Sequence, residues 1–476
     1  MPGIKWTVSI ICQYYDDDQV FFDILKEDIG RLDPWVHERI RFFLLKHEEL
    51  SAKATAYTTN ADGLPEKILW EQQPVDFYDN LSVAQGLWEN FFRLPVAVEG
   101  AKHLVMTIGH GAGMGFCTKA GLTDAFNATF TYQLMEKLHV MLSGGTVNFS
   151  QAHTTTFALK QNLFQFNAGL ANIGQQLPAA VIEKFGMVPM SVFAQALQNS
   201  FVTEKPVFLL FGNCYLQTVE NGYLLKDRAL FLGASEGVYN AVGTDYPALF
   251  RLMANEAPAE EAHYLHVAEQ FCNGIEEKLK DQRVINCFAG QDAAFLLVKN
   301  GFPYSINRLS QYDTLKTTLS ALGDFFFENK SVTYSRIHHV RANSLLCRDV
   351  AANPMGITDL YQFCKELDKD AAAHAAAGNA LSPVLRAVDD PQSPLVVAAR
   401  FPPSCYDTTA GGPNVISPFG CSVFFPGTMV QPLLEQYLNF FFRDFYQNQQ
   451  YITPFLAGNG WRRFVIDFYR FPNLGG

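Results

Sequence analysis

The first third of the chain alternates short apolar runs with stretches in which apolar residues recur at helical spacing. The apolar runs at 5–12, 39–45 and 103–108 predict buried strands. Residues 81–93 predict a helix, and 19–32 predict another, because one face of that stretch collects Val20, Phe21, Ile24, Leu25 and Ile29. Strands that alternate with helices indicate an α/β fold.

The middle of the chain repeats this alternation. A strand is predicted at 207–211, a helix at 216–225 and a further strand at 229–234. Strand, helix and strand in succession are typical of a parallel sheet with crossover helices. We therefore expect a mainly parallel central sheet, whose ligands and reactive groups gather at the carboxyl ends of its strands.

The pattern also indicates how the chain is organised. A long insertion at about 118–200 is rich in Thr, Asn, Gln and Phe, and the chain beyond residue 303 is mostly helical in pattern. The Pro- and Gly-rich stretch 391–426 predicts loops and short strands. We predict an α/β domain over 1–300 that carries the insertion, and a C-terminal helical and hairpin region over 301–476 that packs on the same fold.

Composition narrows the possible partners. The 476 residues are 48% hydrophobic and 17% charged, as expected of a soluble protein with a large core, and 41 of them are Phe. A net charge of −11 repels phosphate backbones, which argues against nucleic acid as a partner. No run reaches the roughly 18 apolar residues of a membrane span. The short apolar run 7–12 indicates a strand and not a signal peptide, so we expect a cytoplasmic protein.

The nine cysteines are scattered and form no CxxC pair. This usage is typical of free thiols in a reducing compartment, not of a disulfide framework or a zinc site. The pairs His338-His339 and His263/His266 lack the accompanying carboxylate or cysteine ligands of a metal site. We therefore predict no metal and no cofactor, and ask whether one cysteine is a nucleophile.

Cys214 and His110 each follow a predicted strand. In a parallel sheet their side chains would emerge at the same edge, where a thiol nucleophile and its base must meet. A thiol needs a base or a positive field to ionise at neutral pH, and a helix beginning at Leu216 would supply part of that field. The amides of Gly111 and Cys214 are candidate donors to an oxyanion.

Each of these signals is weak by itself. A cysteine at a strand end is commonly a small core residue, and a lone Gly-His-Gly is common. The glycines near His110 do not form a dinucleotide-binding loop, because Met114 stands where the third glycine is needed. A GxSxG match centred on Ser235 follows a strand, but no helical pattern follows it as a serine-hydrolase elbow requires.

A longer segment adds specificity. The sequence from Asn213 to Leu225, NCYLQTVENGYLL, resembles the block around the nucleophile of clostripain-like cysteine peptidases. Other blocks resemble that family in the right order: Trp6-Thr7-Val8 with Asp16-Asp17-Asp18, Gly109–Gly113, Ala234-Ser235-Glu236, Gly356–Phe363, Gly420–Pro426 and Trp461–Phe464. The resemblance therefore extends from residue 6 to about 470.

The resemblance implies a caspase-like (clan CD) α/β/α sandwich and a cysteine endopeptidase. The thiolate of Cys214 would attack the substrate carbonyl, and His110 would move the proton to the leaving amine. In this family the segment containing Ser235 and Glu236 borders the substrate pocket. Protein or peptide substrates are the implied partners, and calcium activates some members of the family.

The sequence departs from the family pattern in the pocket. Gly212 stands where the family has an Asp that binds a basic side chain at the cleavage position, and Val242 stands where the family can carry another acid. A Lys or Arg side chain without a carboxylate would be desolvated and unpaired. We therefore predict that Arg and Lys are not preferred, unless Asp245 replaces the lost acid.

The insertion is the second departure. The family often cleaves itself in this region, where Lys119, Lys137 and Lys160 are candidate sites if basic specificity survives. Alternatively, the insertion covers the cleft until a regulatory protein moves it. Two other functions stay open: an inactive pseudo-peptidase that binds peptides or a partner, and a scaffold whose aromatic C-terminal third binds another protein.

Overall fold

The apolar runs form the centre of the structure, a computed structural model of the chain. It describes residues 3–13, 15–48, 51–58, 67–73, 81–111, 113, 115–117, 187–237, 239, 244–255, 260–278, 280–287, 304–343, 357–369, 371–392, 394–401, 420–425, 455 and 458–470. Most of the predicted insertion therefore lies outside the described residues, together with Lys119, Lys137, Lys160 and Val242.

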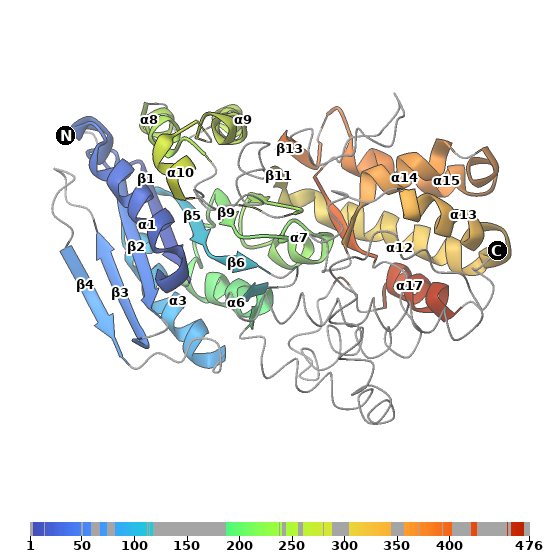
Figure 1. Ribbon diagram of the computed structural model, residues 1–476, viewed down its shortest axis with the longest axis horizontal. Helices are drawn as coiled ribbons and strands as arrows, with labels where there is room; N and C mark the ends of the chain where they lie inside the picture. Colours follow the sequence, from blue (N-terminus) through green and yellow to red (C-terminus); the bar gives the residue numbers. More distant parts are fainter. Residues whose placement is uncertain are drawn as a thin grey trace.

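A nine-stranded sheet runs through the molecule (Figure 1). Its central strands, from β10 to β2, pair parallel to one another, and the strands beyond them on both sides add antiparallel. The five strands predicted from apolar runs are these parallel strands, so the mainly parallel sheet is confirmed. From edge to edge the order is β13 (Val396–Arg400), β11 (Tyr304–Arg308), β10 (Phe231–Ala234), β9 (Phe208–Gly212), β5 (Lys102–Ile108), β1 (Trp6–Cys12), β2 (Ile40–Glu48), β3 (Lys53–Thr58) and β4 (Lys67–Gln72).

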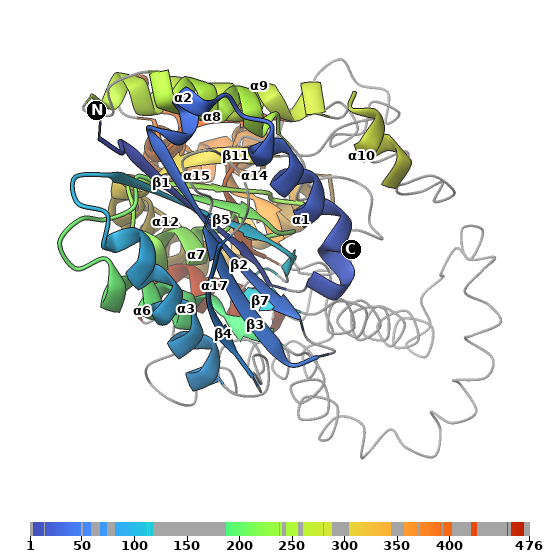
Figure 2. The same cartoon turned by 90° about the vertical axis from the view of Figure 1, so that its left-hand side faces the viewer.

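Alternating side chains of these strands enter two separate hydrophobic cores, as the pleat of a strand requires. In β1, Val8 and Ile10 enter one core and Ile11 the other. Figure 2 shows helices over both faces of the sheet, which confirms the α/β/α sandwich. The first face carries α1 (Tyr15–Gly30), α2 (Pro34–His37), α8 (Tyr246–Asn255) and α9 (Glu261–Lys278), with α10 (Gln282–Cys287) beside α1; the second carries α3 (Leu81–Val96), α6 (Met190–Ser200), α7 (Val219–Leu225) and α12 (Tyr312–Glu328).

The C-terminal region is built into the same body. It supplies β11 and β13 to the main sheet, and α12 packs closely on α17. A Cβ atom at Gly323 of α12 would lie 2.3 Å from the Trp461 amide nitrogen, so only glycine allows this crossing. The remaining elements are η2 (Leu309–Gln311), α13 (Lys330–Asn343), α14 (Leu360–Lys369), α15 (Ala371–Val388), α17 (Gly460–Arg470), the β12 (Ile357–Asp359) and β14 (Ser422–Phe424) pair, and a small sheet of β6 (His110–Gly111), β7 (Gly115–Cys117) and β8 (Met187–Pro189).

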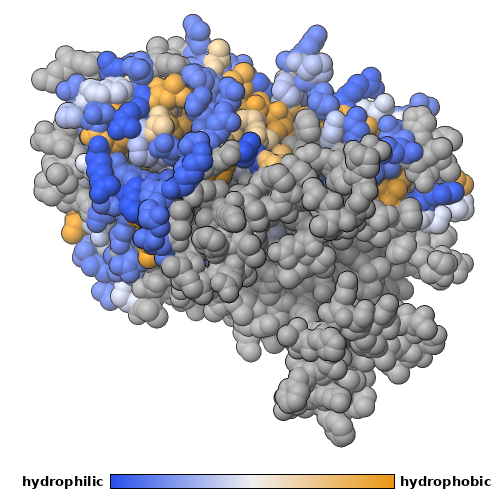
Figure 3. Space-filling view, turned by 45° about the horizontal axis from the view of Figure 1, so that its top comes forward, coloured by the Kyte–Doolittle hydropathy of each residue, from blue (hydrophilic) through white to orange (hydrophobic). Residues whose placement is uncertain are grey.

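One face of the molecule is mainly polar over its described part. On the face drawn in Figure 3, hydrophilic residues cover most of the described area, with smaller apolar areas between them. The rings of Phe425, Trp461, Phe464 and Phe468 in the C-terminal region are buried against one another, so they offer no exposed aromatic patch to a partner.

None of the helices in the described ranges combines the length and the apolar character needed to cross a bilayer.

Candidate active site

His110 and Cys214 follow neighbouring strands that end together. Strands β5 and β9 pair in parallel, with Ile108 opposite Gly212. His110 and Cys214 each lie two residues beyond this last pair. The register therefore places both residues at the same carboxyl-end rim of one parallel sheet.

The two loops that leave these strands are in direct contact. A Cβ atom at Gly111 would lie 2.3 Å from the carbonyl oxygen of Cys214 and 3.1 Å from Cβ of Asn213. No other residue type fits at Gly111 without displacing the turn at Cys214. His110 is half-buried, and Cys214 is 6% exposed.

A buried amide ties three strand ends together beside His110 and Cys214. Asn213 Nδ2 donates to Gln13 Oε1 at 2.8 Å and to the His110 carbonyl at 3.1 Å. Thr107 Oγ1 donates to Asn213 Oδ1. Because Gln13, His110 and Asn213 follow β1, β5 and β9, these bonds fix the loop ends relative to one another. Sequence reasoning did not single out Asn213 or Gln13, although a polar residue directly after an apolar strand is the signal that could have found them.

Asn221 makes a second link between the two loops. Its side-chain nitrogen donates to the Gly113 carbonyl at 2.7 Å and to the Leu216 carbonyl at 3.0 Å. Asn221 is buried in the first turn of α7, where Thr218 Oγ1 also accepts from the Asn221 amide. The loop after His110 is therefore held to the turn after Cys214, a role that the sequence analysis did not foresee.

The helix expected from Leu216 begins only at Val219, so the predicted start is wrong. Tyr215 lies in the left-handed region with φ of 60°, and its amide donates to the Gly237 carbonyl at 2.9 Å. The Gln217 amide donates to the Ser235 carbonyl at 3.0 Å. These bonds to a neighbouring segment hold the turn after Cys214 outside the helix, so the amino end of α7 is not placed directly at the thiol.

The sulfur of Cys214 contacts the backbone of Tyr239. The Tyr239 amide donates to Sγ at 3.3 Å, and Sγ lies 3.4 Å from the Tyr239 carbonyl oxygen, which can accept the thiol proton. Among the described cysteines only Cys214 follows the carboxyl end of a parallel strand beside the His110 loop. Burial raises the pKa of the thiols of three others, which disfavours their ionisation at neutral pH: Cys272, Cys364 and Cys421.

The predicted pocket residues lie in several places. Gly212 is buried at the end of β9. Ser235 Oγ donates to the Gly237 carbonyl and accepts from the Gly237 amide, and Glu236 Oε1 accepts from Ser422 Oγ at 2.6 Å.

Asp245 Oδ1 accepts from the Ala248 amide at 3.2 Å, as a residue that caps α8 does. Side-chain bonds therefore hold Ser235, Glu236 and Asp245 within the fold.

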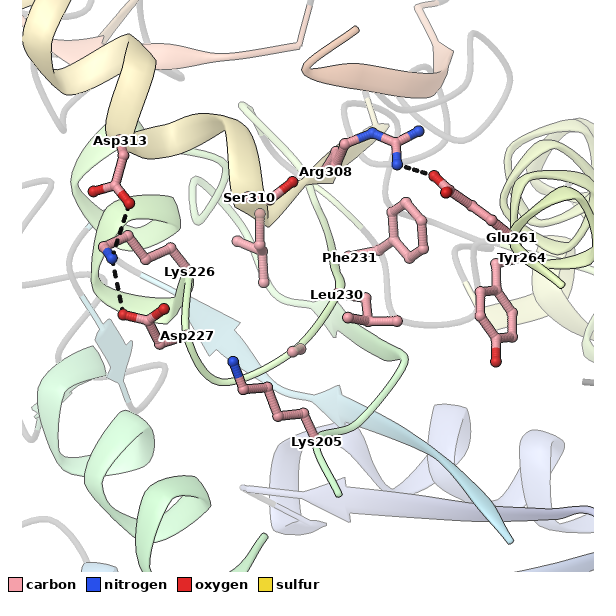
Figure 4. Close-up of a pocket in the computed structure, with 12 residues that line it drawn as sticks. Lys205, Lys226, Asp227, Leu230, Phe231, Glu261, Tyr264, Arg308, Ser310 and Asp313 are labelled. Carbon is pink, nitrogen blue, oxygen red and sulfur yellow. Dashed lines mark hydrogen bonds and ion pairs between the residues drawn. The ribbon is translucent and has the colours of Figure 1, made fainter. Parts of the chain in front are cut away.

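A separate pocket of about 370 Å³ lies at the other end of the central strands, near their amino ends (Figure 4). Lys205 precedes β9 and Leu230 precedes β10, so this pocket borders the amino ends of strands whose carboxyl ends face Cys214. Its other charged side chains largely pair with one another: Lys226 with Asp227 and Asp313, and Arg308 with Glu261. Its place in the fold therefore separates it from the His110–Cys214 rim.

The side chains of His338 and His339 lie outside the described residues, and the histidines of the other pair do not join this rim. His263 is buried beside Trp6, with ring centroids 6.2 Å apart, and His266 is exposed on α9. No three His, Cys, Asp or Glu side chains in the described part of the chain come together in the manner of metal ligands.

Comparison with known proteins supports the fold. No protein-family model matches the chain, and no curated protein matches it. A secreted C11 cysteine protease from Bacteroides thetaiotaomicron, "iotapain", is 14% identical, with a TM-score of 0.57 over 92% of this chain and 98% of that one.

Two further solved structures are similar over nearly their whole length. An inactive zymogen C11 protease from Parabacteroides distasonis is 12% identical, with a TM-score of 0.54 over 94% of this chain and 99% of that one. A secreted C11 cysteine protease from B. thetaiotaomicron in complex with an irreversible peptide inhibitor is 13% identical, with a TM-score of 0.51 over 96% of this chain and 99% of that one. At these identities the comparison defines the fold, and the chain has the α/β/α fold of the C11, clostripain-like cysteine proteases.

Proposed function

We propose that this protein is a cysteine endopeptidase that hydrolyses peptide bonds with Cys214 as nucleophile and His110 as general acid and base. One observation carries the proposal. The β5–β9 register brings His110 and Cys214 to one rim of the sheet, and the Gly111 loop lies directly against the Cys214 backbone. The shared fold with C11 proteases supports the same assignment.

The proposed reaction uses only groups at this rim. His110 takes the thiol proton, and the Cys214 thiolate attacks the substrate carbonyl, which forms a C–S bond. The amides of Gly111 and Cys214 donate to the oxyanion. His110 then gives its proton to the leaving amine, and a water molecule hydrolyses the acyl-enzyme. No step requires a metal or cofactor, so we expect activity to persist in the presence of EDTA.

We propose further that the cleavage position does not prefer Arg or Lys. Gly212 provides no carboxylate at the end of β9, and Asp245 caps α8 through Oδ1. A cationic side chain that is buried in a pocket without a partner costs several kcal/mol, so an uncharged side chain is favoured. Peptides that differ only in Arg, Lys, Leu, Ala or Asp at the cleavage position test this; a clear preference for Arg would contradict it.

The catalytic assignment is tested with the same peptides. We expect Cys214→Ala and His110→Ala to lower kcat/KM by about three orders of magnitude or more, because the two side chains act as a unit. An Asn199→Ala variant, changed at an exposed position of α6, serves as the control. Unchanged hydrolysis in both dyad variants would refute the assignment.

An inactive, peptide-binding protein is the alternative, and one observation favours it: the backbone of Tyr239 lies against the sulfur that must attack. An electrophilic peptide probe separates the two functions. A peptidase is labelled at Cys214 and hydrolyses peptides, whereas a binding protein retains the peptide intact.

Regulation and self-processing are proposed from the family resemblance. We expect the intact mass of the wild-type protein to fall on incubation and that of Cys214→Ala to stay constant if the chain cleaves itself. A constant mass in both, with activity that appears only on addition of another protein, would indicate a regulatory partner instead.

A further inference from the structure

Residues 235–237 run antiparallel beside the turn that carries the thiol. The Gln217 amide donates to the Ser235 carbonyl at 3.0 Å, and the Tyr215 amide donates to the Gly237 carbonyl at 2.9 Å. Two residues further along, Tyr239 meets the Cys214 sulfur, with its amide nitrogen at 3.3 Å and its carbonyl oxygen at 3.4 Å. In a continuing antiparallel ladder, the backbone of Tyr239 would bond to another backbone group. Here it contacts the Cys214 sulfur instead.

The side chain of Tyr239 is anchored in the core. It is 5% exposed, its ring centroid lies 4.8 Å from that of Tyr304, and the Tyr304 ring in turn lies 5.0 Å from that of Phe271. Burial raises the pKa of the Tyr239 phenol well above its ordinary value, so the ring stays neutral. A ring packed in this way fixes the backbone to which it is attached.

The two backbone groups suit the two protonation states of the sulfur. A thiol can donate a hydrogen bond to the Tyr239 carbonyl, whereas a thiolate can accept a hydrogen bond from the Tyr239 amide. A hydrogen bond to the charged form favours that form, so an amide that points at the sulfur stabilises the thiolate. The same contacts cover one side of a sulfur whose residue is only 6% exposed.

We propose that Tyr239 is a positioning residue for Cys214: its buried ring holds the Tyr239 backbone against Sγ, which stabilises the thiolate and restricts access to it. The catalytic consequence rests on the proposed peptidase function. The effect on the thiol does not, because it can be measured without any substrate.

The test is the alkylation rate of Cys214 by iodoacetamide in the full chain, followed by mass spectrometry from about pH 5 to pH 10, a range that spans ordinary and perturbed thiol pKa values. Tyr239→Ala should move the midpoint of the pH profile upward by about one pH unit, because without its ring the backbone no longer holds the amide against the sulfur and one charge-assisted hydrogen bond is lost. It should also raise the plateau rate at high pH several-fold, because the sulfur becomes accessible. Tyr239→Phe keeps the ring and should leave the midpoint within about 0.3 of a pH unit of the wild-type value.

Tyr334→Ala is the matched control. Tyr334 is a fully buried tyrosine of α13 that donates to Asp467 at 3.0 Å, far along the chain from the thiol and packed against Phe464 and Phe468. Its truncation should lower the melting temperature without moving the alkylation midpoint. An equal shift in this control, or an unchanged profile in Tyr239→Ala, would overturn the proposal.

A second measurement covers the case in which Tyr239→Ala does not fold. The Tyr239 amide should exchange with deuterium faster in Cys214→Ala than in the wild type, because its acceptor has been removed. Equal uptake in the peptide that contains Tyr239 would also overturn the proposal. If the thiol behaves as expected but no peptide is hydrolysed by any form, the peptidase function fails and the positioning role stands.

Discussion

Gly111 lies where the loop after β5 passes over the backbone of Cys214, and this contact leaves no room for a side chain. A Cβ atom there would meet the carbonyl oxygen of Cys214 and Cβ of Asn213, which cannot rotate away, as well as Cγ of Leu216. The position of His110 relative to Cys214 therefore depends on glycine at position 111, because a larger residue would push the two loops apart.

We predict that Gly111→Ala destabilises the protein by about 1–3 kcal/mol and lowers kcat more than it raises KM, because it separates the two loops. Gly86→Ala in α3 is the control, since a Cβ atom there meets nothing within 4 Å. That change should be neutral or stabilise the helix by up to about 1 kcal/mol. Denaturant unfolding and peptide hydrolysis measure the two effects; equal behaviour of the two alanine variants would contradict the prediction.

His103 is a buried residue of β5 that faces Thr7 and lies outside the candidate site. Its Nδ1 is 2.7 Å from Thr7 Oγ1, and burial lowers its pKa from 6.5 to about 4. Between these two values the unfolded chain binds a proton that the folded chain does not, so stability is complete above about pH 6.5 and falls as the pH is lowered towards 4.

We predict that this residue costs about 2–3 kcal/mol of unfolding free energy between pH 7.5 and pH 4.5. His103→Gln should remove that part of the pH dependence, whereas His266→Gln, at an exposed position of α9, should leave it in place. Urea unfolding at the two pH values checks this, and an unchanged slope in His103→Gln would show that the pKa of His103 is not lowered by folding.

At the scale of elements, α7 does more than cover the sheet. Its first turn carries Asn221, whose side chain bonds to the loop after His110 and to the turn after Cys214. The helix is short, and Thr218 caps its amino end through Oγ1. The turn after Cys214 is therefore ordered by a helix that begins only after that turn is complete.

We predict that Asn221→Ala lowers kcat and destabilises the protein by about 1–3 kcal/mol for each carbonyl that is left buried without its donor. Asn379→Ala, at an exposed position of α15, should change stability by no more than about 0.5 kcal/mol. Thermal unfolding with parallel activity assays distinguishes the two; full activity in a stable Asn221→Ala protein would show that α7 does not position the site.

At the scale of the whole molecule, the C-terminal region is connected to the site through stacked helices. A Cβ atom at Gly222 of α7 would overlap the ring of Tyr312, and one at Gly323 would overlap the backbone of Trp461. Helix α17 thus packs on α12, and α12 packs on α7 beside the Cys214 turn. These close crossings explain how the described helices α12 and α17 are joined to α7 and through it to the sheet.

We predict that Gly323→Ala forces α17 away from α12 and destabilises the protein by at least about 1–3 kcal/mol, the usual cost of overpacking. The fluorescence of Trp461, which is 1% exposed, should shift to longer wavelength as its environment becomes more polar. A Gly86→Ala protein should show neither change. Wild-type fluorescence and stability in Gly323→Ala would mean that the two helices can separate without cost.

The sequence by itself determined the parallel sheet and the order of its strands along the chain. Strands buried on both faces must be apolar throughout, and the runs at 5–12, 103–108 and 207–211 meet this requirement. The same pattern located His110 and Cys214 at strand ends, and the structure places both at one rim. Their catalytic roles stay predictions, as do the domain boundary and the self-cleavage sites.

The tertiary structure decided how the rim is built. The links from Asn213 and Asn221, the late start of α7, the helix cap at Asp245 and the contact of Tyr239 with the sulfur were not visible in the sequence. Each depends on hydrogen bonds or packing between segments far apart in the chain. Local patterns of apolar and polar residues report whether a segment is buried, but not which distant backbone group its side chain will meet.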